Sequence, residues 1–169
     1  MNIVLTGFMA TGKTEISKAL CTLTDRKYID TDQMIENAEG ISINEIFAQY
    51  GEEYFRKAEK EAVKKAASEK NAVIATGGGV VLDKENIDIL RKSSVIINLH
   101  PDFEVIKERL KKASATRPLL QNQSIEDVRK RFDARLPFYA NCDEKVHIVS
   151  GKTPLEFAKE ILEIMKKYE

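Results

Sequence analysis

The chain has few of the features that mark several classes of protein. It contains two cysteines, Cys21 and Cys142, and neither has the spacing of a metal site. Charge of one sign is not in excess, because 27 Lys and Arg balance 27 Asp and Glu, so broad binding to nucleic acid is not expected. No apolar stretch approaches transmembrane length, and no basic run followed by an apolar segment opens the chain. We therefore expect a cytoplasmic protein without a leader, a membrane contact or a nucleic-acid partner.

Two functional signatures are also missing. The sequence has no Asn-Lys-x-Asp motif, which removes the guanine-reading element of a GTPase switch. Its two histidines, His100 and His147, are isolated in the sequence, and no cluster of His, Cys and carboxylate side chains indicates zinc.

A phosphate-binding motif stands at the start of the chain. The apolar run Ile3-Val4-Leu5 leads directly into Gly7–Thr14, which fits the P-loop pattern G-x-x-x-x-G-K-[ST] between a strand and a helix. Gly7 and Gly12 allow tight turns, so that the backbone N–H groups of the loop, including those of Ala10 and Thr11, point toward one anion. Lys13 then reaches the β- and γ-phosphates and Thr14 ligates Mg²⁺. This pattern predicts a nucleoside triphosphate site.

Apolar runs and helical patterns alternate along the chain, which predicts an α/β fold with a mainly parallel sheet between helical layers. A length of 169 residues suits a single domain, 1–169. The expected strands lie near Asn2–Thr6, Lys27–Asp30, Ala72–Thr76, Val95–Leu99 and Val146–Val149. The expected helices are Lys13–Leu23, one from Ser42 toward Gln49, Glu52–Ser68, Asp102–Lys112, Ser124–Leu136 and Pro154–Tyr168.

Two stretches interrupt the alternation. Residues Thr31–Tyr50 read as a helical insertion after the second strand, part of a substrate-binding region over 31–60. Residues 112–123 are polar, lack periodicity and contain Arg117-Pro118, which is typical of a mobile loop that could serve as a lid. Arg117 on such a loop could close over a transferring phosphoryl group.

Carboxylates stand where the second expected strand ends, at Asp30 and Asp32. Alternation along an extended chain would place both on one side, facing the crevice at the carboxyl edge of a parallel sheet. One could hold Mg²⁺ through water while the other accepts a proton from an attacking hydroxyl. A solvated turn is the simpler alternative.

Arginines and glycines complete the set of candidate site residues. Arg56 follows Tyr54-Phe55, and Arg135 precedes Pro137, contexts that suit bidentate capture of a carboxylate, although most helical arginines are surface charges. Gly77, Gly78 and Gly79 follow a buried strand and allow a ligand to approach the backbone closely.

Taken together, these segments resemble the shikimate kinase family, within the nucleoside-monophosphate-kinase group of P-loop proteins, over nearly the whole chain. Three of these segments are more specific to the family than the P-loop: the Arg-x-x-Glu motif, the triple glycine and the Arg-Pro-Leu-Leu segment. The chain departs from the family pattern at one place, because the family usually has another glycine where this chain has Ala10 or Thr11. The segments that carry the resemblance are Gly7–Thr14, Asp30-Thr31-Asp32, Phe55-Arg56-x-x-Glu59, Val73–Gly79, Arg117-Pro118-Leu119-Leu120 and Arg135-x-Pro-x-Tyr139.

The resemblance implies a sheet of order 2-3-1-4-5 and Mg-dependent transfer from ATP to shikimate, yielding ADP. It implies that Lys13 polarises the phosphates, that Asp32 orients or deprotonates the acceptor hydroxyl, and that Arg117 is the lid arginine. The remaining roles it implies are ATP binding by Arg109 and Lys152-Thr153-Pro154, Mg²⁺ binding by Thr14 and, through water, Asp30, and substrate binding by Arg56, Arg135 and Gly77–Gly79. We expect a monomer.

Two other functions share part of this signature. A gluconate-kinase-like or nucleotide-kinase-like enzyme would have the P-loop and the lid but not the two carboxylate-binding arginines around a triple glycine. Outside enzymes, an ATP-regulated binding module would hydrolyse ATP slowly in order to change shape.

Overall fold

The computed structural model describes residues 1–114 and 123–169. Its strands form one parallel sheet in the order β2-β3-β1-β4-β5, so the expected sheet and its order are confirmed. The strands are β1 (Asn2–Thr6), β2 (Lys27–Asp30), β3 (Ala72–Ala75), β4 (Ser94–Pro101) and β5 (Glu144–Ile148).

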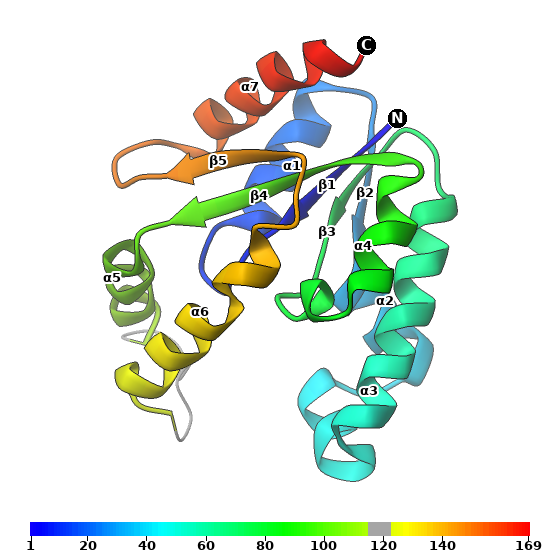
Figure 1. Cartoon of the computed structure of the whole chain (residues 1–169), viewed down its shortest axis with the longest axis vertical. Coiled ribbons are helices and arrows are strands. Elements are labelled where there is room, and N and C mark those ends of the chain that lie inside the picture. Colours follow the sequence, from blue (N-terminus) through cyan, green and yellow to red (C-terminus); the bar gives the residue numbers. More distant parts are fainter. Residues whose placement is uncertain (115–122) are drawn as a thin grey trace.

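Helices connect the strands and cover both faces of the sheet (Figure 1). The α-helices are α1 (Lys13–Leu23), α2 (Thr31–Glu39), α3 (Ile43–Ser68), α4 (Lys84–Arg91), α5 (Phe103–Ser114), α6 (Ile125–Tyr139) and α7 (Pro154–Met165). Short 3-10 turns lie at η1 (Val80–Leu82) and η2 (Lys166–Tyr168).

Strand β1 is the centre of the core because it is buried on both faces, as a central parallel strand must be. Ile3 and Leu5 pack into a cluster with α1 and α7 residues such as Phe157. Val4, between them, packs into a second cluster on the opposite face, which includes Val63 of α3. The alternation of one strand therefore builds a three-layer α/β/α arrangement.

Parallel pairing brings the carboxyl ends of the strands to one edge of the sheet, and this edge positions the site. Strand β1 ends there and enters the Gly7–Thr14 loop, while β2 ends at Asp30. Thr76, just after β3, is tied to β1 because its backbone N–H donates to the Leu5 carbonyl at 3.1 Å. Helices α2 and α3 (light blue to cyan) extend beyond this edge in Figure 1.

The two helices expected on either side of Gly51 are confirmed as the two arms of α3, which meet at a sharp kink where Gly51 leaves the helical conformation (φ 83°, ψ 177°). The structure differs from the expected helices in two other places. Helix α4, capped by the Asp83 side chain, occupies a stretch for which we expected no element. Helix α6 was expected to end before Pro137, which is wrong: it continues to Tyr139.

The continuation of α6 has a physical reason. Pro137 removes one backbone donor to the carbonyl four residues earlier, a cost that the contacts of the next turn must offset. The next turn is held by the Ala140 N–H, which donates to the Leu136 carbonyl at 3.1 Å. Tyr139 is buried, and its hydroxyl donates to the Gly78 carbonyl at 2.7 Å, which fixes the last turn against the glycine segment.

Candidate active site

The Gly7–Thr14 loop wraps around one point in front of α1. Gly12, with φ 91°, precedes α1 in the left-handed region that glycine adopts without strain. Ala10 also has a positive φ, 61°, which is uncommon for a residue with a side chain. The Arg109 guanidinium donates to the Ala10 carbonyl at 2.9 Å and supports this part of the loop from α5.

The start of α1 leaves its backbone donors available. Gly12 provides no side-chain cap to α1. Free N–H groups at a helix N-terminus, together with the helix dipole, form an anion site. By contrast, α2, α3, α4, α6 and α7 each start with a side-chain cap, supplied by Asp30, Ser42, Asp83, Ser124 and Thr153.

Lys13 lies folded over the loop. Its ammonium group donates to the carbonyls of Gly7 and Phe8 at 2.6 and 2.8 Å. Burial lowers the pKa of Lys13 to about 8, although the negative charges of Asp32 and Asp30 oppose this change. Lys13 is thus a cation held on the loop carbonyls, with the negative charges of Asp32 and Asp30 nearby.

Asp30 is fixed at the end of β2 by both of its oxygens. Its Oδ1 accepts from the Gln33 backbone N–H at 3.1 Å, and its Oδ2 accepts from the Tyr28 hydroxyl at 3.2 Å. The Tyr28 hydroxyl also forms a hydrogen bond with Thr14. The Thr14 hydroxyl and the Asp30 carboxylate therefore share one partner, and they form the hard oxygen donor set that suits Mg²⁺.

Asp32 reaches the same cavity by a different route from the one expected. Strand β2 ends at Asp30 and α2 begins at Thr31, so Asp32 lies in the first helical turn instead of two positions along a strand. It still lines the cavity with Asp30 and Lys13. Burial, followed by repulsion from Asp30, raises the pKa of Asp32 to about 6. A carboxylate with this pKa suits proton acceptance near neutral pH.

Arg56 is held in place by its own helix. Its Nη1 donates to Glu59 Oε1 at 2.9 Å, one turn later on α3, and Glu59 is only 1% exposed. The guanidinium lies directly against Gly79, because a Cβ at that position would lie 2.8 Å from Arg56 Nη2. Only glycine leaves room for the guanidinium here.

Arg135 approaches the glycine segment from α6. A Cβ at Gly78 would lie 3.5 Å from Arg135 Nη1, which is ordinary contact distance. The Arg135 guanidinium also lies over the Phe8 ring, 5.9 Å from its centroid. Gly77 lies against Asp32, because a Cβ at this position would lie 2.5 Å from Asp32 Oδ1.

These groups surround one cavity of about 420 Å³. Its charged side includes Lys13, Asp32, Arg56 and Arg135, and its apolar side includes Phe55. The sequence reasoning had assigned no role to several lining residues, and the only signal for Arg131 was its place one helical turn before Arg135. The residues it missed are Met9, Ile43, Phe47 and Arg131.

The other residues expected to bind ATP are less closely grouped. Arg109 contacts the loop, as described above. Thr153 caps α7, and Lys152 forms an ion pair with Glu160 and lies 4.9 Å from the Phe157 ring centroid. The turn before them lies next to α5, where the Ser150 hydroxyl donates to Glu108 Oε2 at 3.4 Å. Arg117 and most of the expected lid fall in 115–122, outside the described residues.

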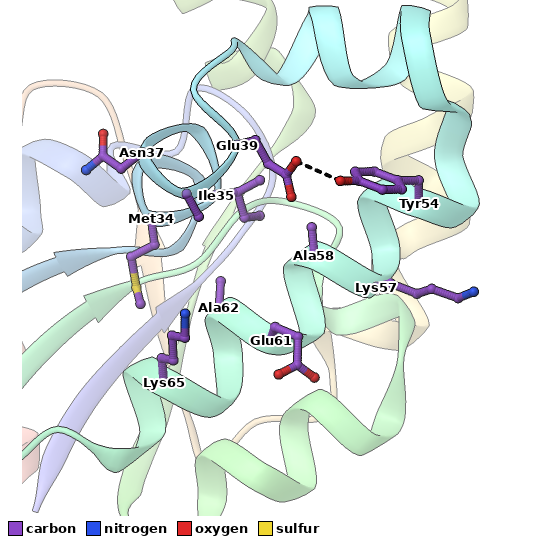
Figure 2. Close-up of a pocket in the computed structure, with 11 residues that line it drawn as sticks. Met34, Ile35, Asn37, Glu39, Tyr54, Lys57, Ala58, Glu61, Ala62 and Lys65 are labelled. Atoms are coloured by element: carbon purple, nitrogen blue, oxygen red, sulfur yellow. Dashed lines mark hydrogen bonds between the residues drawn. The ribbon is translucent and has the colours of Figure 1, made fainter.

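A larger hollow of about 700 Å³ lies between α2 and α3 and shares no lining residue with the cavity (Figure 2). Its mouth is bridged by the Tyr54 hydroxyl, which donates to Glu39 Oε2 at 2.7 Å. Its lining includes two lysines and two glutamates but no residue of the Gly7–Thr14 loop. Lys13 and Thr14 of the loop, together with Arg56 and Arg135, line the smaller cavity instead.

Among residues 1–114 and 123–169, no helix is both long and apolar enough to cross a membrane. Within that same part of the chain, no three or more His, Cys, Asp or Glu side chains gather to hold a metal ion. Thr14 and Asp30 alone would not complete the coordination of Mg²⁺, so phosphate and water oxygens would supply the rest.

A P-loop at the carboxyl edge of a parallel sheet, with an arginine-lined cavity beside it, defines a small-molecule kinase of the P-loop class. A family model described as shikimate kinase matches residues 9–166. The chain belongs to the shikimate kinase family and is an ATP-dependent kinase. This family assignment decides against the gluconate-kinase-like, nucleotide-kinase-like and non-enzyme alternatives.

Similar proteins cover nearly the whole chain. The shikimate kinase of Caldanaerobacter subterraneus subsp. tengcongensis is 50% identical over 165 residues, which are 95% of this chain and 94% of that protein. The shikimate kinase of Thermodesulfovibrio yellowstonii is 43% identical over 169 residues, 99% of this chain and 95% of that one. The structure of Acinetobacter baumannii shikimate kinase in complex with shikimate has a TM-score of 0.88 and 29% identity, covering 99% and 94% of the two chains.

Proposed function

We propose that the chain transfers the γ-phosphoryl group of ATP to the 3-hydroxyl of shikimate in the 420 Å³ cavity, giving ADP and shikimate 3-phosphate. One observation carries the placement of the acceptor. Arg56 and Arg135, from different helices, flank the Gly78-Gly79 backbone in the cavity that also contains Lys13. Two guanidinium groups on either side of the Gly78-Gly79 backbone suit a small carboxylic acid.

The reaction needs positioning and charge stabilisation more than covalent chemistry. Lys13 moves from the loop carbonyls to the β/γ-phosphate oxygens and neutralises the charge that develops there. Asp32 accepts a hydrogen bond from the attacking hydroxyl and takes its proton as the P–O bond forms. Arg56 and Arg135 hold the carboxylate, while Gly77–Gly79 allow close approach, so the ring can turn its hydroxyl toward the phosphate.

The divalent ion fits the residues that are present. Thr14 would ligate Mg²⁺ directly and Asp30 would hold it through water, with Tyr28 fixing both side chains. When bound, Mg²⁺ supplies charge neutralisation to the β/γ-phosphate oxygens.

Different parts of the chain serve the acceptor and ATP. Residues 31–60 form the acceptor region, since Asp32 and Arg56 come from α2 and α3. Arg109 and the Lys152-Thr153-Pro154 turn bind the nucleotide beside the loop. Arg117, in the expected 112–123 lid, engages the phosphates of ATP.

Coupled measurement of ADP release with four acceptor conditions tests this function. The conditions are shikimate, gluconate, AMP and no acceptor, each with and without Mg²⁺. We expect release to depend on shikimate and on Mg²⁺. Turnover with gluconate or AMP but not shikimate would contradict the proposed acceptor, and hydrolysis at one rate in every condition would contradict phosphoryl transfer.

A further inference from the structure

Arg131 is a third guanidinium in the acceptor cavity. It lies on α6 one turn before Arg135, and both side chains line the cavity with Arg56. Positions four apart on a helix share one face, so the two arginines project in the same direction. The sequence motifs of the site include Arg135 but not Arg131.

Within the described part of the chain, the hydrogen-bond partner of the Arg131 side chain is an amide and not a carboxylate. Arg131 Nη2 donates to Gln123 Oε1, a neutral amide at the start of the α6 region. Burial, followed by the positive charge of Arg135, lowers the pKa of Arg131, while the negative charge of Asp127 opposes this change. Two like charges at this helical spacing destabilise the unliganded protein slightly. An anion bound between them would turn that repulsion into attraction.

The neighbouring Arg129 shows the ordinary arrangement of an arginine on the same helix. Its Nε lies 3.4 Å from Asp133 Oδ2, and its guanidinium lies 4.8 Å from the centroid of the Phe103 ring. Arg129 does not line the cavity. Its charge is therefore satisfied within the protein, whereas that of Arg131 faces the acceptor site.

We propose that Arg131 binds the carboxylate of the acceptor together with Arg56 and Arg135 and sets the enzyme's preference for acidic over neutral acceptors. This inference rests on the proposed function, because it concerns the acceptor of that same cavity. It assigns Arg131 a role in acceptor binding, so its loss changes the acceptor KM and leaves kcat and the ATP KM nearly unchanged.

The experiment compares Arg131→Gln with the wild type on shikimate and on its uncharged methyl ester. A hydrogen bond to a charged group contributes about 1.5–3 kcal/mol, which corresponds to a rise in the shikimate KM of about tenfold or more. With the methyl ester, we expect the two proteins to have KM values within about twofold of each other, the spread expected when no charged hydrogen bond is lost. An equal rise for acid and ester, or no rise for either, would overturn the proposal.

Two matched variants separate binding from structure. Arg129→Gln removes a guanidinium from the same helix and is expected to leave the shikimate KM unchanged. Gln123→Ala removes the amide partner of Arg131 but keeps the charge, so the shikimate KM is expected to stay the same or fall. If Gln123→Ala raised the KM as much as Arg131→Gln does, Arg131 would act only through that structural contact and the proposal would be wrong.

The outcomes also distinguish this inference from the proposed function. If the wild type phosphorylates shikimate and Arg131→Gln does so with the same KM, only the inference about Arg131 fails. If the wild type does not phosphorylate shikimate, the proposed function fails first. Thermal unfolding of each variant, compared with the wild type, identifies any loss of activity that comes from misfolding.

Discussion

Arg56 and Glu59 form an ion pair of 2.9 Å within one turn of α3, and Glu59 is almost completely buried beneath the guanidinium. Burial raises the pKa of Glu59, while the charge of Arg56 lowers it. A carboxylate enclosed in this way is costly to keep ionised unless its partner stays in place. The pair therefore fixes the direction in which Arg56 faces the glycine segment.

The variant Glu59→Gln tests this relationship. Glutamine keeps the size of the side chain but not its charge, so Arg56 gains freedom to leave the position beside Gly79. We expect the shikimate Kd to rise about tenfold, or roughly 1.4 kcal/mol, with ATP affinity unchanged by calorimetry. Glu61→Gln, on the exposed side of α3 where Glu61 pairs with Lys64, is the control and is expected to bind shikimate normally. Equal losses for both substrates in Glu59→Gln would show a general structural effect.

The glycine segment provides a second, steric test. In Gly79→Ala the new methyl group would lie 3.0 Å from Arg56 Cζ, so the flexible guanidinium must move while the backbone stays. Gly78→Ala places a methyl group in the same cavity but no closer than 3.5 Å to any neighbour, so it separates the effect of an added methyl group from that of displacing Arg56. We expect Gly79→Ala to raise the shikimate KM at least about tenfold, the loss of one charged hydrogen bond, with little change in Tm. Parallel behaviour of the two variants would contradict the assigned contact.

The shifted pKa values of Asp32 and Lys13 predict a bell-shaped pH profile for kcat/KM. Asp32 loses its negative charge as the pH falls through about 6, and Lys13 loses its positive charge as the pH rises through about 8. Each change removes a charged form that the reaction requires, so kcat/KM falls at both acidic and alkaline pH. In Lys13→Arg the cation persists at high pH, and the alkaline limb of ATP binding is expected to disappear. A flat profile between pH 5 and 9 would be inconsistent with both roles.

The raised pKa of Asp32 also predicts that its charged form lowers the stability of the fold, although the reaction requires that form. Its pKa in the folded state, about 6, exceeds the ordinary 3.8, so the native state binds a proton more tightly than the unfolded state does. Stability is therefore lost as the pH rises from 3.8 through about 6. Asp32→Asn is neutral throughout and is expected to gain about 1–3 kcal/mol at pH 7.5, since one pKa unit corresponds to about 1.4 kcal/mol.

Urea unfolding of Asp32→Asn and wild type at two pH values checks this expectation. The difference in unfolding free energy should shrink at pH 4.5, while turnover of the variant should be lost at both. Asp25→Asn, at a position away from the cavity lining, is the control and should show no such pH-dependent gain. A destabilised Asp32→Asn at pH 7.5 would mean that the attraction between Asp32 and Lys13 outweighs the cost of burial.

Much of the fold could be predicted because local patterns and global packing agree. Strand β1, helix α1 and strand β2 have the expected bounds, since buried runs and the P-loop define them sharply. Helix α4 was missed because its signal is only the Asp83 cap and the spacing of Ile87 and Leu90. Pro137 was misread because the contact between Tyr139 and Gly78, which holds the last turn of α6, is a tertiary one.

The contacts that position the site residues were harder to predict than the motif residues themselves. The motifs identified Lys13 and Arg56, but no periodicity shows that the Lys13 side chain folds onto the Gly7 and Phe8 carbonyls. Arg131 lies outside every motif and enters the cavity only because α6 packs beside the phosphate loop. Such contacts depend on how distant elements meet.

Calorimetric titration of shikimate into wild type, Arg56→Ala and Arg135→Ala tests the central claim most directly. The account predicts that each variant loses at least about 1.5–3 kcal/mol of shikimate binding, or roughly tenfold to a hundredfold in Kd, while ATP still binds as in the wild type. An unchanged shikimate Kd in both variants would show that the two guanidinium groups do not hold the acid and would contradict the account.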